Sequence, residues 1–374
     1  MSGTYGDSTR SIKAVGSEAI PGEPVAPPPV PAAAYHLPPD EDDSLDSYGR
    51  SSNPTWRQLE SALAQLEGAA GALTFGSGMA AITSVLRTVA DPGRKIVVPA
   101  DGYYQVRAYA NEFLAPRGVT VVEARCAEMC DAAADTGRDD VVLAETPSNP
   151  GLDVVDLHQL AMTCRARGSI LVVDNTTATP LGQQPLSLGA DLVVASATKA
   201  LAGHHDVLAG YVAGSHPEVM ERLQRERLLS GPVLGSFEAW LVLRSLGSLG
   251  LRFERQCQNA AAVALMLRSH PAVKSVRYPG LPDDPSHAVA TMQMRRFGGV
   301  VAVELADRGA VHALVARSAL LVAATSFGGI HSSVDRRARW GDPVPEGFAR
   351  FSLGIEDTDD LLSDIEQALD PAGR

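Results

Sequence analysis

The fold is decided by residues 169–199, which read SILVVDNTTATPLGQQPLSLGADLVVASATK. This stretch contains two apolar runs of strand length, ILVV and LVVA, and each run ends in polar residues. Short, continuous apolar runs bounded by turn residues are typical of strands buried on both faces, as in a parallel sheet. The stretch therefore predicts two strands of such a sheet.

The same pattern recurs on the N-terminal side of this stretch. Apolar runs that end in polar residues read KIVVPADGYY from residue 95 and VVLAETPSNP from residue 141, with helix-length segments between them. This alternation predicts βαβ units with right-handed connections and a mostly parallel sheet. Ligands of such sheets bind beyond the carboxyl ends of the strands. The residues at those ends are Asp101, Tyr103, Glu145, Asn149, Asp174, Ser196, Thr198 and Lys199.

Lys199 is one of only four lysines among the 32 basic residues of the chain. Arginine does not lose its proton at accessible pH, whereas a buried lysine can act as a neutral amine nucleophile. An amine at the end of one strand and a carboxylate, Asp174, at the end of a neighbouring strand suit pyridoxal phosphate (PLP). In that arrangement the amine holds the cofactor covalently, and the carboxylate pairs with the pyridine nitrogen so that the ring can accept electrons.

The phosphate group of PLP needs hydrogen-bond donors. Residues 76–81, GSGMAA, open a predicted helix whose first backbone N–H groups, at Gly78 and Met79, suit an anion. Ser196 and Thr198 add hydroxyl groups from the other side. Each feature alone is equally well explained by a glycine turn, a helix cap or a strand end. Their collection at one edge of one sheet favours a cofactor site.

Composition and charge argue against several classes of protein. The net charge of −12 and the pI near 5.2 argue against nucleic acid or an anionic membrane as the partner. The longest apolar runs are too short to span a bilayer, and the first ten residues lack a signal-peptide core, so we expect a cytoplasmic protein. The four cysteines form no CxxC pair and have no metal-ligand spacing with histidine, so we expect reduced thiols and no metal site.

The chain divides into three expected parts. Residues 1–52 are proline-rich and then acidic, which leaves open a disordered tail or an extended arm laid over another surface. Residues 53–245 carry the alternating strand and helix pattern and form the expected large domain. Residues 246–374 contain the runs VKSVRYPGL, GGVVAVEL and LLVAATSFGG and predict a smaller α+β domain.

These motifs resemble the PLP-dependent enzymes of cysteine and methionine metabolism, which include cystathionine γ-synthase, cystathionine γ-lyase, cystathionine β-lyase and methionine γ-lyase. The resemblance covers nearly the whole chain and rests on YGRSSNPTWRQLESALAQLEG, GSGMAAI, ETPSNPGLDVVDL, VVDNT, SATKALAGHHDVLAG, YPGL, RFGGVVAVEL and RFSLGIED, in the family's order. It implies the α/β fold of the aspartate aminotransferase type (type I), with a large, mostly parallel-sheet domain and a smaller α+β C-terminal domain. It also implies PLP as the cofactor and a homotetramer, a dimer of dimers with active sites shared between subunits.

The resemblance also implies roles for individual residues. Lys199 would hold the cofactor and move protons, Asp174 would pair with the pyridine nitrogen, and Tyr103 would stack on the ring and help as an acid or base. Arg350 would bind the substrate α-carboxylate, with Ser326 nearby. The remaining cofactor-binding residues would be Gly78, Met79, Asn149, Ser196 and Thr198, with Tyr48 and Arg50 of the arm reaching the phosphate in a neighbouring subunit.

The chain departs from the family around the pocket for the distal end of the substrate. Tyr104 and Gln105 stand where two glycines are usual, and His331 occupies the position of a glutamate found in many γ-acting members. We place His331 in the wall of the substrate pocket, with an exposed surface position as the alternative. Residues 334–349, VDRRARWGDPVPEGFA, replace the usual sequence and bring three arginines that could recognise a distal carboxylate. We expect methionine or homocysteine to compete well with cystathionine.

The activity predicted from these residues is that of a PLP-dependent C–S lyase. It would perform γ-elimination on a sulfur-containing L-amino acid of the cystathionine, methionine or homocysteine type. A γ-replacement synthase (cystathionine γ-synthase or sulfhydrylase-like) uses the same core residues and stays open. The alternative of another class is a non-catalytic PLP-binding scaffold or regulator, which the presence of Lys199, Tyr103 and Arg350 argues against.

Overall fold

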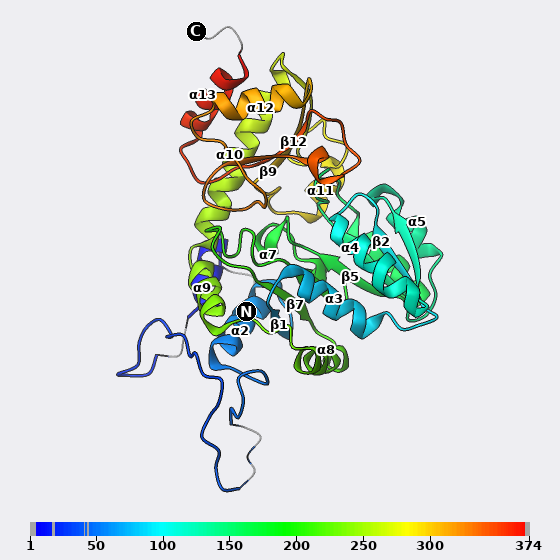
Figure 1. Cartoon of the computed structure of the whole chain (residues 1–374), viewed down its shortest axis with the longest axis vertical. Helices are drawn as coiled ribbons and strands as arrows, with labels where there is room; N and C mark the ends of the chain where they lie inside the picture. Colours follow the sequence, from blue (N-terminus) through cyan, green and yellow to red (C-terminus); the bar gives the residue numbers. More distant parts are fainter. Residues whose placement is uncertain (1–4, 17–18, 41, 43–44, 371–374) are drawn as a thin grey trace.

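Two sheets organise the chain in this computed structural model, which describes residues 5–16, 19–40, 42 and 45–370. One sheet has seven strands and the other has five, and the long helix α10 (Leu249–Ser269) runs alongside both (Figure 1). Within the described ranges, no helix combines the length and the apolar character needed to cross a membrane.

The larger sheet has the strand order β1-β7-β6-β5-β4-β2-β3. Its strands β2 to β6 pair in parallel, whereas β7 runs antiparallel to both of its neighbours, β1 and β6. The two strands predicted within residues 169–199 are β5 and β6, which lie side by side. The predicted mostly parallel sheet is confirmed. Its strands are β1 (Gly71–Phe75), β2 (Lys95–Pro99), β3 (Thr120–Ala124), β4 (Val141–Glu145), β5 (Ile170–Asp174), β6 (Leu192–Ala195) and β7 (Gly210–Gly214).

Helices cover both faces of this sheet, which explains why its strands are apolar throughout. On β4, Val141 and Leu143 pack in the same core cluster as α3, whereas Val142 and Ala144 pack with α5 and α6 on the opposite face. Successive side chains of a strand point to opposite faces, so both sets must be apolar. The helices of this half are α2 (Pro54–Glu67), α3 (Gly78–Val89), α4 (Tyr104–Tyr109), α5 (Met129–Ala134), α6 (Leu157–Arg167), α7 (Thr179–Gly182), α8 (Pro217–Ser230) and α9 (Ser236–Leu246).

The smaller sheet has the strand order β10-β11-β12-β9-β8. Its neighbouring strands are antiparallel, except for β10 and β11, which are parallel. Helices α10, α12 (Arg308–Arg317) and α13 (Thr358–Leu369) share one core cluster with these strands, and α11 (His287–Gln293) lies nearer the larger sheet (Figure 1). The predicted smaller α+β part is confirmed. Its strands are β8 (Val273–Arg277), β9 (Val300–Leu305), β10 (Val322–Ala323), β11 (Ser333–Arg336) and β12 (Phe348–Ser352).

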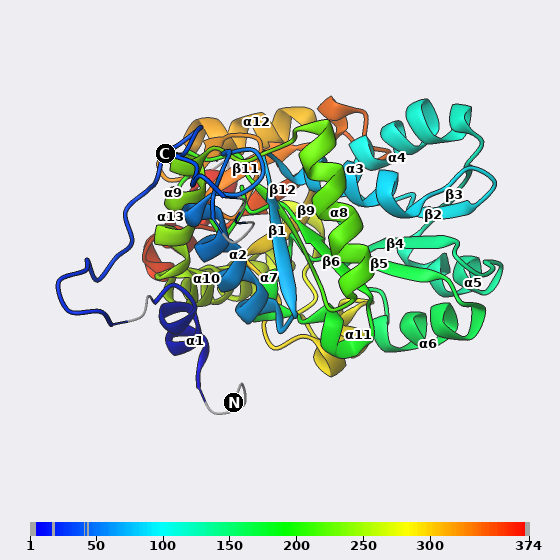
Figure 2. The same cartoon turned by 90° about the horizontal axis from the view of Figure 1, so that it is seen from below.

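The N-terminal arm begins with a helix that the sequence did not predict, α1 (Asp7–Ala14). An eight-residue helix is marginal in isolation, but α1 packs on α10 at Gly250, where a Cβ atom would lie 2.6 Å from the Cα of Ser8. The following segment loops away from the body of the chain (Figure 2) and returns at Val30, whose N–H donates to Thr55 Oγ1 (3.0 Å). The arm is therefore extended over most of its described length and anchored at both ends.

Candidate active site

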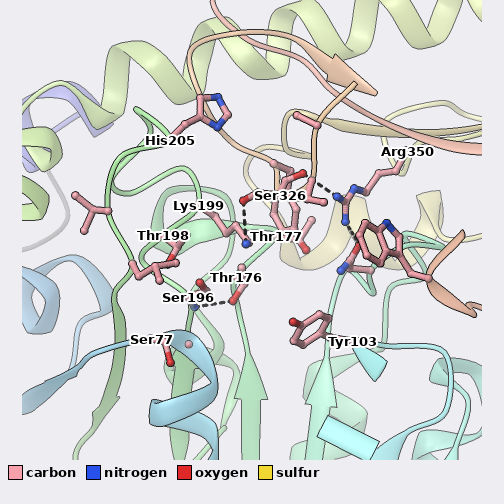
Figure 3. A pocket seen from close by; sticks show the side chains of 18 of the residues that line it. Ser77, Tyr103, Thr176, Thr177, Ser196, Thr198, Lys199, His205, Ser326 and Arg350 are labelled. Carbon is pink, nitrogen blue, oxygen red and sulfur yellow. Dashed lines mark hydrogen bonds between the residues drawn. The ribbon is translucent and has the colours of Figure 1, made fainter. Parts of the chain in front are cut away.

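A cavity of about 1220 Å³ lies at the carboxyl ends of β4, β5 and β6 and reaches the smaller sheet. It draws residues from both halves of the chain, as Figure 3 shows for Ser77, Lys199 and Arg350. Residues expected to form the site and found lining this cavity are Gly78, Met79, Tyr103, Asn149, Asp174, Ser196, Thr198, Lys199, Ser326, His331 and Arg350.

Lys199 projects into the centre of this cavity (Figure 3). Its Nζ donates a hydrogen bond to Ser326 Oγ (3.0 Å) and lies 5.3 Å from the centre of the Phe327 ring. Burial, followed by the positive charge of Arg350, lowers the pKa of Lys199 from its usual 10.5 to about 8. A far larger share of this amine is therefore neutral near physiological pH than in an ordinary lysine, and the neutral form is the one that acts as a nucleophile or base.

Asp174 ends β5 and is buried beneath the cavity. Its Oδ1 accepts a hydrogen bond from the Thr176 backbone N–H (2.9 Å). Burial raises the pKa of Asp174, and the Thr176 hydrogen bond and the charge of Lys199 oppose that rise. A buried carboxylate in this position is stabilised by a cation, so the site suits a ligand with a protonated nitrogen.

Glu145 is a second buried carboxyl group, and the register of β4 and β5 places it directly beside Asp174. Its two oxygens accept the backbone N–H groups of Tyr103 and Asn149, both at 2.7 Å. Burial is the main cause that raises the pKa of Glu145, and the charge of Asp174 raises it further. The sequence placed Glu145 at the correct sheet edge but assigned it no role; the structure shows that it fixes two loops of the site.

The start of α3 lies beside β6 and could hold an anion. Ser77 caps the helix by accepting a hydrogen bond from the N–H of Ala80 (3.0 Å). The N–H groups of Gly78 and Met79, in the first turn, have no acceptor within the helix. A Cβ atom on Gly78 would lie 2.7 Å from the Cβ of Ser196, so only glycine fits this approach. The Thr198 hydroxyl also lines the cavity, although it already donates to the Ala209 carbonyl (3.1 Å).

Arg350 on β12 closes the side of the cavity formed by the smaller sheet. Its Nη1 donates to Asn149 Oδ1 (2.5 Å) and its Nη2 donates to the Ser326 carbonyl (2.7 Å). Its buried Nε has no hydrogen-bond partner among the described residues. Ser326 has a left-handed backbone (φ 74°), which lets it accept from Lys199 through its hydroxyl and from Arg350 through its carbonyl.

His331 is exposed and lines the mouth of the cavity. The expected position in the pocket wall and the alternative position at the surface therefore each describe part of its environment. Its ring stacks on that of His205, with centroids 6.3 Å apart and planes at 14°. Burial is the main cause that lowers the pKa of His205, and the neighbouring His331 lowers it further. Nothing in the sequence indicated that His205 would contact His331, because the two histidines are 126 positions apart in the chain and meet only in the fold.

Tyr48 and Arg50 lie outside the cavity of their own chain. They line a separate hollow of about 310 Å³ with residues of the arm and of the segment before α9. Arg50 donates to the Leu228 carbonyl (2.7 Å) and lies over the ring of Tyr48, a residue that is 48% exposed. The two residues are thus available at a surface rather than at the site beside Lys199.

Comparison with known proteins accounts for this arrangement. The family model for the Cys/Met metabolism PLP-dependent enzymes matches residues 12–370. The chain belongs to this family. A protein of Streptomyces coelicolor, provisionally named cystathionine gamma-lyase, is 47% identical over 98% of this chain and 94% of its own length. The L-methionine gamma-lyase of Pseudomonas putida is 39% identical, with 86% of this chain and 84% of that protein covered.

A solved structure gives the same result for the fold. Cystathionine gamma synthase from Xanthomonas oryzae, in complex with aminoacrylate and cysteine, superposes with a TM-score of 0.92 at 34% identity and covers 98% of each chain. The predicted family, the type I fold class and the PLP cofactor are confirmed, and the chain is a PLP-dependent enzyme of cysteine and methionine metabolism.

The residues of this chain fit the cofactor. The amine of Lys199 is partly neutral, Asp174 is a buried carboxylate suited to a cationic nitrogen, and the first turn of α3 offers backbone donors for a phosphate. Among the described residues there is no cluster of three His, Cys, Asp or Glu side chains that could hold a metal ion. All four cysteines are free thiols.

Proposed function

We propose that this family member is a C–S lyase that performs γ-elimination on a sulfur-containing L-amino acid. The convergence of Lys199, Asp174 and Arg350 on one cavity is the observation that carries the proposal. Two relatives whose names describe gamma-lyases support elimination. The residues that we assign to cofactor and substrate are those expected from the sequence, with Glu145 added as a positioning residue.

Arg350 binds the α-carboxylate of the substrate in this proposal. Burial lowers the pKa of Arg350 to about 10, so the guanidinium remains a cation at neutral pH. Its buried Nε lacks a partner within the described ranges, which leaves a charge-assisted donor for a carboxylate. Ser326 lies beside both Arg350 and Lys199 and thereby places the substrate carboxylate next to the base.

Lys199 removes the proton from Cα of the substrate and carries protons between carbon positions. Bound PLP supplies the electron sink that stabilises negative charge at Cα, and Asp174 maintains that property through its carboxylate. Loss of a second proton, from Cβ, allows the thiolate to leave Cγ. Water then converts the remaining unsaturated amine to a 2-oxo acid and ammonium.

Tyr103 is suited to protonate the departing sulfur. Burial, and then the neighbouring Tyr104, raise the pKa of Tyr103, so its hydroxyl keeps its proton at neutral pH. The Glu145 carboxyl group fixes the backbone of Tyr103 and thus the start of α4.

The distal end of the pocket favours a short or apolar γ-substituent. Arg336 pairs with Glu346 (2.7 Å), Arg337 pairs with two buried carboxylates, and Arg339 stacks over Trp340. Two of the three arginines that could have recognised a distal carboxylate are thus paired with carboxylates of the chain, and the third is held against the Trp340 ring. We therefore propose methionine or homocysteine type substrates ahead of cystathionine.

γ-Replacement is the second candidate, supported by the likeness to the cystathionine gamma synthase of Xanthomonas oryzae. A panel of L-cystathionine, L-methionine and L-homocysteine, scored for 2-oxo acid, ammonia and thiol, tests elimination. An activated homoserine ester with added thiol, scored for thioether, tests replacement. Thioether formation without 2-oxo acid would overturn elimination, and the absence of both products would overturn catalysis on these substrates.

We also propose a homotetramer, built as a dimer of dimers, in which Tyr48 and Arg50 serve the site of a neighbouring subunit. The extended arm and the exposure of Tyr48 support this assignment. The arm would comprise residues 1–52, the PLP-binding domain residues 53–245 and the small domain residues 246–374. Free cysteines and metabolic relatives support a cytoplasmic location.

A further inference from the structure

Four buried charged side chains form a chain of ion pairs beside the substrate pocket. In order of contact they are Asp342, Arg337, Asp335 and Arg350, and each is at most 7% exposed. Two guanidinium groups alternate with two carboxylates, so the charges balance within the cluster. A buried ion that loses its partner is costly, which makes the alternation necessary for a stable arrangement.

Asp335 is the central link of this cluster. The antiparallel register of β11 and β12 places Asp335 directly opposite Arg350, with both side chains on the same face of the sheet. Its Oδ2 accepts from Arg337 Nη1 (2.7 Å) and lies 3.4 Å from Arg350 Nη2. Its Oδ1 accepts from Trp340 Nε1 (2.9 Å). Trp340 therefore holds Oδ1 and Arg337 holds Oδ2, while Oδ2 also faces Arg350.

Arg350 depends on Asp335 for its charge balance. Its other two acceptors, Asn149 Oδ1 and the Ser326 carbonyl, are neutral, and Asp335 is the carboxylate paired with it in the described part of the chain. Without Asp335, the buried guanidinium groups of Arg337 and Arg350 would lack the negative charge that separates them. Their repulsion would favour other rotamers of Arg350.

We propose that Asp335 is a positioning residue for substrate binding: it holds the Arg350 guanidinium in place so that the free Nε can take the substrate α-carboxylate. Arg337, Trp340 and Asp342 hold Asp335 in turn. Residues 334–349 thus shape the carboxylate end of the pocket rather than its distal end. The inference rests on the proposed role of Arg350, and its test must separate the two.

The test compares the binding of two ligands to the PLP-loaded enzyme. L-Norleucine has no leaving group, and n-pentylamine is the same molecule without the carboxylate. In Asp335→Asn, which keeps a side-chain oxygen for Trp340, we expect the Kd for norleucine to rise about tenfold while that for pentylamine stays unchanged. KM for a turned-over amino acid should rise by a similar factor, with a smaller change in kcat.

Glu346→Gln provides the matched control. It removes an ion pair of the same segment, that with Arg336, at an exposed position away from Arg350. This variant should bind both ligands as the wild type does. Asp335→Glu keeps the charge and should retain part of the norleucine affinity.

Each outcome decides between the two proposals. If Arg350→Gln binds norleucine like the wild type, the role of Arg350 is wrong and the inference falls with it. If Arg350→Gln no longer binds norleucine but Asp335→Asn binds it with wild-type affinity, the positioning role of Asp335 alone is overturned. An equal loss of affinity for norleucine and pentylamine in Asp335→Asn would indicate general damage to the site and would also overturn the positioning role.

A second variant covers the case in which Asp335→Asn does not fold. The triple variant Asp335→Asn/Arg337→Gln/Asp342→Asn removes the guanidinium that would otherwise be left without Asp335, and also the carboxylate of Asp342 that pairs with that guanidinium. It should fold and show the same selective loss of norleucine binding. Wild-type affinity for norleucine in this triple variant would overturn the inference.

Discussion

At the scale of single residues, the chemistry of the site depends on how burial and charge act on Lys199. Burial and the charge of Arg350 lower the pKa of this lysine to about 8, while Asp174 acts in the opposite direction. About a tenth of the amine is then neutral at pH 7, compared with less than about a thousandth for an ordinary lysine. The active site thus provides its own nucleophile without a neighbouring base.

This pKa predicts how cofactor attachment depends on pH. A protonated amine is not nucleophilic, so the rate at which PLP attaches to the cofactor-free protein should rise with pH and level off above about pH 8. Arg350→Gln removes one cation, raises the pKa of Lys199 and should move the midpoint to higher pH. Rapid mixing with PLP, followed by absorbance, measures the rate.

The control for this experiment is Arg336→Gln, which removes a cation that pairs with Glu346 and does not contribute to the shift at Lys199. Its midpoint should match that of the wild type. Identical midpoints in Arg350→Gln and the wild type would contradict the electrostatic account.

Lys199 and Asp174 could be predicted from the sequence because Asp174 ends one apolar strand and Lys199 comes shortly after the next, and parallel strands bring their ends together. Asp335 could not be predicted in this way. Its contact with Arg350 depends on the register of two short antiparallel strands, and the sequence VDRRARW shows neither the pairing nor the face. Sequence patterns found residues that share a sheet edge, and the family resemblance added Arg350 and Ser326 from across the pocket, but neither indicated Asp335.

At the scale of elements, the mouth of the pocket joins two loops from different halves of the chain. His205 lies in the loop between β6 and β7, and His331 lies just before β11. Because burial and the adjacent ring lower the pKa of His205, it is mainly neutral at pH 7. His205 therefore brings little charge to the end of the pocket where a γ-substituent would emerge.

This arrangement predicts a change of preference in His331→Glu. A carboxylate at the mouth would attract the distal ammonium of cystathionine, whereas methionine has no such group. We expect the ratio of kcat/KM for cystathionine to that for methionine to increase by about two- to fivefold, as for a solvent-exposed ion pair. His331→Gln, which adds no charge, should leave the ratio near the wild-type value. An unchanged ratio in His331→Glu would contradict a substrate-facing position.

A buried carboxyl group links helix α2 to strand β7. Glu67, the last residue of α2, accepts the hydroxyl of Tyr211, and its other oxygen has no hydrogen-bond partner within the described residues. Burial raises the pKa of Glu67 from 4.5 to about 7. The contact therefore makes the stability of the fold depend on pH.

The sign of this dependence follows from proton binding. Between about pH 4.5 and pH 7 the folded chain holds a proton on Glu67 that the unfolded chain has lost, so the free energy of unfolding falls as pH rises. Glu67→Gln keeps an acceptor for Tyr211 and removes the titration. From pH 5.5 to pH 8, the variant should gain about 2 kcal/mol relative to the wild type, measured by urea unfolding with saturating PLP. Parallel pH curves for the two proteins would contradict this.

At the scale of the whole molecule, the proposed assembly depends on the N-terminal arm. One chain supplies Lys199, Asp174 and Arg350 to its cavity, while Tyr48 and Arg50 of the same chain lie at a separate hollow. A cofactor phosphate at the start of α3, as we propose, would meet backbone donors and hydroxyl groups. The arginines that line the described cavity, Arg337 and Arg350, both already pair with Asp335. A guanidinium from a neighbouring arm would supply the missing charge.

Mixing two inactive variants tests this sharing of sites. Lys199→Ala should be inactive because it lacks the amine, and Arg50→Ala should be strongly impaired because the neighbouring site loses its phosphate ligand. In a mixed dimer, the site that retains Lys199 receives Arg50 from the other chain and is complete. Equal mixing makes half of the dimers mixed, with one of two sites restored, so about a quarter of wild-type activity should return. Activity is measured after subunit exchange has been verified by mass-labelled chains. If exchange is complete and no activity returns, Arg50 acts within its own chain and the shared site is wrong.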